Sequence, residues 1–135
     1  MDFTCVPTTC PYCGVGCNLF LQVADGRLAG VMPHKEHPVS EGSLCVKGWN
    51  AHAFVHHADR LTKPQKRSGD GFSEVAWETA FDEIASALKK TVEEHGPESV
   101  AVFVSARCTN EENYLLMKLA RAALKTPHID HCARL

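Results

Sequence analysis

Four cysteines in the first third of the chain constrain its fold more than any other feature. Three of them stand in one short loop with the spacing C-x2-C-x3-C, and the fourth follows after a further 27 residues. Thiolates with this spacing can enclose a cubic iron–sulfur cluster, which takes four cysteine ligands. Gly14 and Gly16 suit such a loop, because wrapping backbone around a cluster calls for positive φ angles and close approach of the chain. The four candidate ligands are Cys10, Cys13, Cys17 and Cys45.

The same thiols have two other possible chemistries. A structural zinc site usually takes its ligands as two pairs, whereas the second half here offers Cys45 alone. His34, His37 and His52 could complete an irregular zinc site. Disulfides fit less well, because the chain has seven cysteines, an odd number, and its N-terminus shows no secretory signal. The spacing therefore favours an iron–sulfur cluster over zinc, and zinc over disulfides.

Composition excludes several classes of partner. The chain of 135 residues carries 14 basic and 16 acidic side chains, so it lacks the basic surface of a nucleic-acid-binding protein. No apolar run approaches the ~20 residues that a membrane-spanning helix needs. We therefore expect no nucleic-acid partner and no membrane span. We also expect a cytoplasmic, reducing compartment, where clustered thiols are typical of metal sites.

Residues 1–60 predict a small antiparallel β domain that holds the cluster. An Asp-Gly pair between two apolar runs is a strong hairpin signal, and the cysteine loop stands at the open end of that hairpin. Because so few residues can form only a small core, we expect the cluster to stabilise the domain as an internal cross-link. The expected strands cover residues 3–7, 18–23 and 27–32, and a short helix or turn follows at 46–55 with three surface histidines, His52, His56 and His57.

Residues 61–135 predict the beginning of an α/β domain with a parallel sheet, after a polar boundary at about 65–72. Apolar residues at helical spacing from Trp77 to Val92 precede Gly96-Pro97, which ends the helix. The apolar run 100–104 predicts a buried strand, and Thr109 begins a capping box for a helix that extends to Leu124. A second strand is expected from Pro127. The fold class is thus a mix of α+β and α/β, and we expect the second domain to be incomplete because one strand between two helices cannot close a sheet.

Four segments together resemble molybdopterin-dependent formate dehydrogenases. The similarity is greatest to the catalytic α subunit of methanogen enzymes that couple to coenzyme F420. It covers all 135 residues, but only the first part of that family's longer chain. The segments that carry the resemblance are Cys10–Cys17, Gly42–Gly48, Ser105–Tyr114 and His131–Leu135.

The resemblance implies two cofactors and a reaction. Cys10, Cys13, Cys17 and Cys45 match the ligands of a [4Fe–4S] cluster. A molybdenum or tungsten ion would be held by two pterin guanine dinucleotides (bis-molybdopterin guanine dinucleotide). Formate would be oxidised to CO2 there, or CO2 reduced, with electrons passing through the cluster. The implied partner is a flavin- and iron–sulfur-bearing β subunit that reduces F420, within a larger heterodisulfide reductase assembly.

Three further residues are candidates for contact with the pterin. Lys47 matches a lysine that lies between the cluster and the pterin in the family. Arg107 and Asn110 fall at a strand-to-helix junction, where a helix N-terminus and loop N–H groups favour anionic ligands. An ordinary surface role for Lys47 and Arg107, and simple capping of the helix by Thr109, are the alternatives. Related functions also stay open: another molybdopterin oxidoreductase of the nitrate reductase or formylmethanofuran dehydrogenase type, or a small electron-transfer or zinc module.

No catalytic residue is expected within the 135 residues. In the family, the motif that matches Cys132–Leu135 is followed at once by selenocysteine or cysteine, the protein ligand of the metal. We expect the reading frame to continue past Leu135 through a selenocysteine codon, and the 135 residues alone to be inactive. Cys108 and Cys132 do not occupy the ligand position, and we expect both to be small buried thiols.

Overall fold

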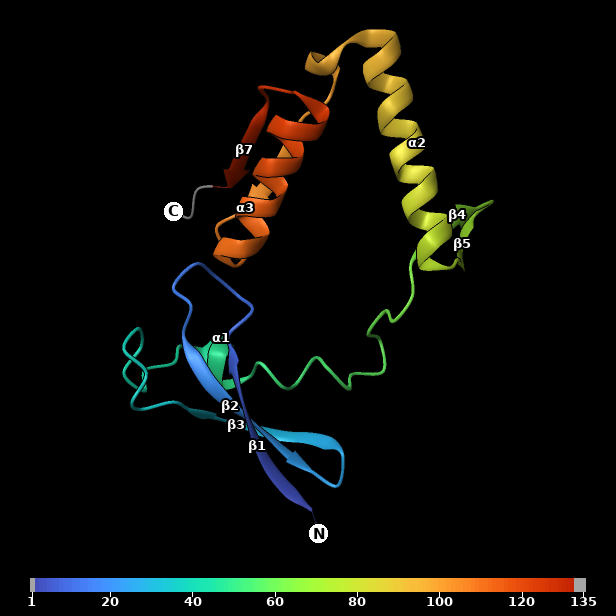
Figure 1. Ribbon diagram of the computed structural model, residues 1–135. Coiled ribbons are helices and arrows are strands. Elements are labelled where there is room, and N and C mark those ends of the chain that lie inside the picture. Colours follow the sequence, from blue (N-terminus) through green and yellow to red (C-terminus); the bar gives the residue numbers. More distant parts are fainter. Residues whose placement is uncertain (1, 133–135) are drawn as a thin grey trace. The chain divides into compact units, whose positions relative to one another are not determined.

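The computed structural model describes residues 2–132, so the last three residues of the Cys132–Leu135 motif lie outside the described part (Figure 1). The described chain forms two compact units, and neither is continuous in sequence. The first comprises residues 2–60, 105–114 and 132, and the second comprises residues 61–104 and 115–131. The strand-to-helix junction after residue 104 therefore belongs to the same unit as the cysteine loop.

A three-stranded antiparallel sheet forms most of the first unit. Its order is β1 (Phe3–Thr9), β2 (Asn18–Ala24) and β3 (Arg27–Pro33), drawn in shades of blue in Figure 1. Asp25 and Gly26 connect β2 to β3 with φ angles of 46° and 76°. Positive φ at both positions is what a two-residue type I′ turn requires. The predicted hairpin is confirmed.

The core of the first unit is small and includes the cysteine loop. Leu19 on β2 is completely buried, and Cys10 and Ala51 are each 5% exposed. Partly buried side chains surround these three: Tyr12, Cys17, Leu21, Val31 and Leu44. One candidate ligand, Cys10, thus belongs to the hydrophobic core, and a second, Cys17, packs against it.

A short helix, α1 (Val46–Trp49), begins directly after Cys45. Downstream of it, two of the three histidines accept hydrogen bonds from backbone groups. Nε2 of His56 accepts from the N–H of Leu28 at 3.1 Å, and Nδ1 of His57 accepts from the N–H of Asp59 at 3.2 Å. Both have the ordinary surface role that the sequence favoured.

The second unit begins with a hairpin that the sequence did not predict. Strands β4 (Gln65–Ser68) and β5 (Gly71–Glu74) pair antiparallel around Gly69, whose φ is 59°. We expected an irregular boundary here, because every residue of both strands is exposed and the segment has no apolar alternation to indicate a strand. An ion pair of 2.8 Å between Lys66 and Glu83 joins the hairpin to the following helix.

That helix, α2 (Trp77–His95), ends at Gly96, which takes a φ of 81°. The helix itself and its end at Gly96 both agree with the prediction from the sequence. Its apolar side is largely uncovered within the described residues: Trp77, Phe81 and Ile84 are each more than half exposed. None of the helices described here has the length and apolar content needed to cross a membrane.

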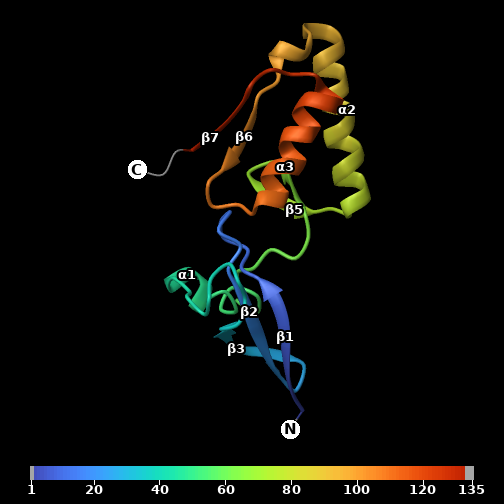
Figure 2. The same cartoon turned by 60° about the vertical axis from the view of Figure 1, so that its left-hand side comes forward.

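The remaining elements alternate as predicted, but the strand that we expected to be buried is not, since Phe103 in it is 78% exposed. A 3-10 turn, η1 (Pro97–Ser99), leads to strand β6 (Val102–Ser105), and helix α3 (Asn110–Lys118) continues as a π-helical segment, η2 (Leu119–Leu124). Strand β7 (Ile129–Cys132) then pairs with β6, and Figure 2 shows the two strands running in the same direction. The widening from α- to π-helix was not predicted; there, the N–H of Thr126 reaches back to the carbonyl of Ala120 at 3.0 Å.

Candidate metal centre

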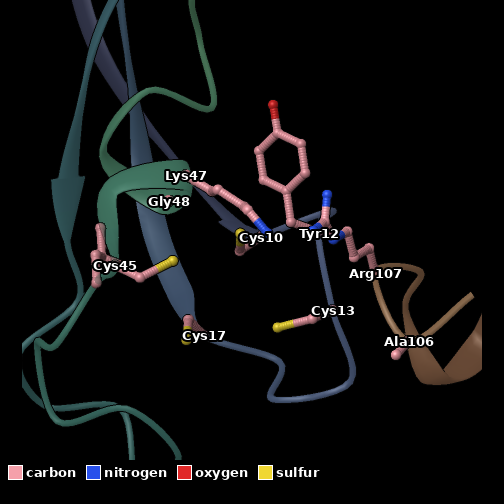
Figure 3. A pocket seen from close by; sticks show the side chains of 10 residues that line it. Cys10, Tyr12, Cys13, Cys17, Cys45, Lys47, Gly48, Ala106 and Arg107 are labelled. Carbon is pink, nitrogen blue, oxygen red and sulfur yellow. The ribbon is translucent and has the colours of Figure 1, made fainter. Parts of the chain in front are cut away.

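The four cysteines surround one cavity of about 100 Å³ in the first unit. Figure 3 shows their sulfurs facing a common space: Cys13 and Cys45 point toward each other, while Cys10 and Cys17 lie between them. The other lining residues are Tyr12, Leu44, Lys47, Gly48, Ala106 and Arg107. The structure therefore brings together ligands that are up to 35 positions apart in sequence (Cys10 to Cys45).

The loop that carries three of these cysteines is held by its own backbone. The N–H of Cys10 donates to the carbonyl of Cys17 at 2.8 Å, which closes the loop at its base. The two glycines serve different purposes. Gly16 takes a φ of 71° in open space, whereas a Cβ on Gly14 would lie 2.6 Å from Oδ1 of Asn110. Gly16 thus provides the positive φ angle of the loop, and Gly14 permits the close approach of the Asn110 side chain.

The cavity environment disfavours thiolate charge at two of the cysteines. Burial raises the pKa of the Cys10 thiol above its ordinary value, and the neighbouring thiols of Cys13 and Cys45 raise it further. The pKa of Cys17 is raised by burial and then by the other three cysteines. Mutual repulsion of this kind requires that the four sulfurs lie close together. A bound cation centre would remove it, because metals take cysteine as thiolate.

The pKa of the Cys45 thiol is shifted in the opposite direction. Cys45 is exposed, and backbone N–H groups of Gly48 and then Lys47 lower the pKa of its thiol, helped by the Lys47 ammonium. These donors come from the short helix that begins after Cys45, so the turn places its unpaired N–H groups at the sulfur. The same groups could donate hydrogen bonds to a sulfur that is bound to metal.

The spacing of the thiols fits a cluster better than a single ion. Among residues 2–132, no three His, Cys, Asp or Glu side chains come close enough to hold one metal ion. A tetrahedral zinc site needs its four ligands around one centre, whereas a cubic cluster presents separate irons to its four thiolates. The donor set and its arrangement around a cavity thus suit a [4Fe–4S] cluster.

The two predicted cationic residues also line this cavity. Lys47 extends from α1 toward Cys10, and Arg107 approaches from the side of Tyr12 and Cys13 (Figure 3). Both side chains also line a second hollow together with Tyr12, Val46 and Asn50. The wall shared by the cavity and this hollow therefore carries two positive charges.

Asn110, the third predicted cofactor residue, uses its amide within the protein. Its Nδ2 donates to the carbonyl of Gly14 at 2.9 Å, which connects the first residue of α3 to the cysteine loop. The capping box is also present, since the hydroxyl of Thr109 accepts from the N–H of Glu112 at 3.3 Å and the Glu112 carboxylate accepts from the N–H of Thr109 at 2.7 Å.

The expectation that Cys108 and Cys132 are buried was partly wrong. Cys132 is exposed rather than buried, because it ends strand β7, and its sulfur lies 3.4 Å from the hydroxyl of Ser105. That hydrogen bond lowers the pKa of the Cys132 thiol. Cys108 is half-buried.

The sequence did not single out four residues of the cavity wall: Tyr12, Leu44, Gly48 and Ala106. Tyr12 packs edge-on against Phe54 with ring centroids 6.2 Å apart, and Gly48 is buried against Leu44. Tyr12 stands inside the cysteine motif, and Gly48 follows the fourth cysteine by three positions. Their nearness to the ligands was the only available signal.

Comparison with known families assigns both halves of the chain. Residues 3–57 match the molybdopterin oxidoreductase Fe4S4 domain, and residues 60–135 match molybdopterin oxidoreductase. The chain belongs to the molybdopterin oxidoreductase family. This membership confirms the predicted [4Fe–4S] cluster and molybdopterin cofactor, and it agrees with the small antiparallel sheet followed by sheets with helices.

Individual members of the molybdopterin oxidoreductase family are similar over the whole chain. The α subunit of the F420-dependent formate dehydrogenase of Methanocaldococcus jannaschii is 54% identical over 135 residues, and a formate dehydrogenase α subunit of Methanococcus maripaludis is 47% identical over the same length. The chain spans 19% of the length of each. Among solved structures, acetylene hydratase from Pelobacter acetylenicus matches 93% of this chain, and 18% of its own, with a TM-score of 0.71 and 28% identity.

Proposed function

We propose that this chain is the N-terminal region of a formate dehydrogenase α subunit. The full subunit would interconvert formate and CO2 at a molybdenum or tungsten ion held by bis-molybdopterin guanine dinucleotide. Cys10, Cys13, Cys17 and Cys45 would hold the [4Fe–4S] cluster that carries the electrons. One observation carries the proposal: the four sulfurs face a single cavity in a chain that is 54% identical, along its entire length, to an F420-dependent formate dehydrogenase α subunit.

The cluster supplies one-electron transfer, and the surrounding residues set its environment. Cys10 lies in the core beside Leu19 and excludes water from one side of the cavity. Cys45 is exposed, so the cavity is accessible at this ligand. The N–H groups of Lys47 and Gly48, together with the Lys47 ammonium, offset the negative charge that four thiolates and an additional electron bring. The cavity is therefore suited to stabilise a reduced cluster.

Lys47 and Arg107 are the residues that we assign to the pterin cofactor, with Asn110 at the same junction. Both cations line the hollow next to the cysteine cavity, where Asn50 adds a polar group. Charged donors of this type recognise anionic and carbonyl-rich ligands. A pterin in that hollow would lie beside the cluster and could exchange electrons with it over a short path.

Electron flow also requires a partner. A cluster with one accessible side can transfer electrons one at a time to an acceptor, and two relatives carry the name F420-dependent formate dehydrogenase. We assign the partner as a β subunit with flavin and iron–sulfur centres that reduces F420, within a heterodisulfide reductase assembly. A cytoplasmic, reducing location suits seven cysteines without a disulfide among the described residues.

The test uses the protein in its full natural length, purified without oxygen. Formate should reduce the cluster, which is observed as bleaching of its visible absorption and as an electron paramagnetic resonance signal. Oxidation of the pre-reduced cluster by nitrate, with no response to formate, would instead assign the protein to the nitrate reductase type. A colourless protein that contains one zinc ion would reject both assignments and leave a zinc module.

A further inference from the structure

The amide of Asn110 lies on the cysteine loop, between the second and third candidate ligands. Its Nδ2 donates to the carbonyl of Gly14 at 2.9 Å, across 96 positions of sequence. Gly14 directly follows Cys13, the ligand farthest from the base of the loop. This hydrogen bond is therefore a direct connection between the segment after β6 and the backbone at a candidate ligand.

The absence of a side chain at Gly14 makes room for this contact. The residue does not take a positive φ, so its conformation alone does not call for glycine. A Cβ at this position would instead lie 2.6 Å from Oδ1 and 3.4 Å from Cγ of Asn110. Glycine therefore permits the close approach of the amide, and any larger residue would displace it.

The rest of the loop has a different anchor. The hydrogen bond from Cys10 to Cys17 closes the base, and both of these cysteines belong to the core or pack against it. Cys13 is at the tip of the loop. For the tip, the Asn110 amide is the hydrogen bond that reaches it from outside the loop among residues 2–132.

We propose that Asn110 is a positioning residue for the cluster: its amide fixes the peptide after Cys13 and so sets the direction of that ligand. The proposal rests on the proposed function, because it needs Cys13 to be a ligand. Arg107 on the same short segment lines the cavity, so the segment would hold the loop tip and one wall of the cluster site together. Residues that orient metal ligands in this way control metal affinity and electronic properties.

The proposal is tested with three variants of the full-length protein, prepared anaerobically. Asn110→Ala removes the donor, Asn110→Asp keeps the shape but presents an oxygen to the Gly14 carbonyl, and Gly14→Ala displaces the amide. In each variant we expect iron to be lost to a chelator about fivefold faster than from the unaltered protein, the change that one neutral hydrogen bond produces. The resonance spectrum of the reduced cluster should change as well, because the geometry at one iron ligand changes.

The double variant separates positioning from general damage. If Gly14 and Asn110 act through one contact, Gly14→Ala combined with Asn110→Ala should lose iron no faster than Asn110→Ala alone. Glu111→Ala is the matched control: it truncates the next residue of the same helix turn, and the Glu111 side chain forms no hydrogen bond or ion pair with the described part of the chain. Its iron loss and its spectrum should equal those of the unaltered protein.

The outcomes distinguish this inference from the proposed function. An iron-free unaltered protein would overturn both. A protein that contains the cluster, in which Asn110→Ala and Asn110→Asp retain the unaltered spectrum and rate of iron loss, would overturn only the positioning role. Additive effects of Gly14→Ala and Asn110→Ala would overturn it too, since each would then act independently.

Discussion

The backbone N–H of Cys10 lies 2.8 Å from the carbonyl oxygen of Cys17, so the first and third cysteines of the motif are joined at the base of their loop. This hydrogen bond fixes the two ends of the loop relative to each other, and a loop that is held in this way loses less conformational entropy when it binds a ligand. The following expectations depend on this organisation and on the different environments of the four thiols.

Replacing Gly16 by alanine should destabilise the cluster-free chain. Its φ of 71° is unfavourable for a residue with a Cβ, although nothing lies within 4 Å of the added carbon. The free energy of unfolding, measured with urea, should fall by about 1–2 kcal/mol. Gly71→Ala is the control, because Gly71 has neither a positive φ nor a close neighbour. Equal stability of the two variants would show that the loop does not need the left-handed conformation.

Cys10→Ala and Cys45→Ala should both abolish the cluster but differ in their effect on the cluster-free chain. Cys10 is 5% exposed and packs in the core, so its removal leaves a cavity that costs roughly 1 kcal/mol or more in the free energy of unfolding. Cys45 is exposed, and its truncation should change that free energy little. Iron content and urea unfolding measure the two effects. Cys5→Ala, at an exposed cysteine outside the loop, should keep its iron.

The charge of Lys47 should raise the reduction potential of the cluster. Its ammonium lines the cavity and favours negative charge there, so Lys47→Met should lower the midpoint potential by tens of millivolts. Lys47→Arg keeps the charge and should lie closer to the unaltered protein. A redox titration followed by the resonance signal of the reduced cluster gives both values. Identical potentials for the methionine and arginine variants would mean that the charge does not act on the cluster.

Alkaline pH should destabilise the cluster-free chain through Cys10. Burial raises the pKa of this thiol in the folded state above its ordinary value of 9.0, so the folded chain holds this proton more tightly than the unfolded chain does. The associated stability is fully present below pH 9.0 and is lost as pH rises through the higher folded-state pKa. The melting temperature should fall over that range, and less so for Cys10→Ala. The same pH dependence in that variant would contradict the assignment.

Local patterns in the sequence were sufficient to predict most elements. The Asp25-Gly26 turn, the end of α2 at Gly96 and the capping box at Thr109 each depend on a few neighbouring residues, and all three are confirmed. The exposed β4–β5 hairpin was missed because no apolar face marks it. The exposure of Cys132 was missed because burial depends on packing between distant segments.

In the candidate site, too, local patterns were predictable from the sequence and long-range contacts were not. Cysteine spacing and resemblance were enough to identify the four thiols that the structure gathers around one cavity. The contact between Asn110 and Gly14 could not be foreseen, because it joins segments 96 positions apart and no residue pattern records such a pair. Chemical character is visible in a sequence, whereas the partner of a particular amide is fixed by the folded chain.

The most direct test of the central claim is a comparison of iron and zinc content between the unaltered full-length protein and Cys45→Ser, both purified without oxygen. We predict that the unaltered protein carries four more iron atoms than the variant and shows a cluster resonance signal that the variant lacks. Equal iron in the two proteins, or one zinc ion lost in place of the iron, would contradict the account.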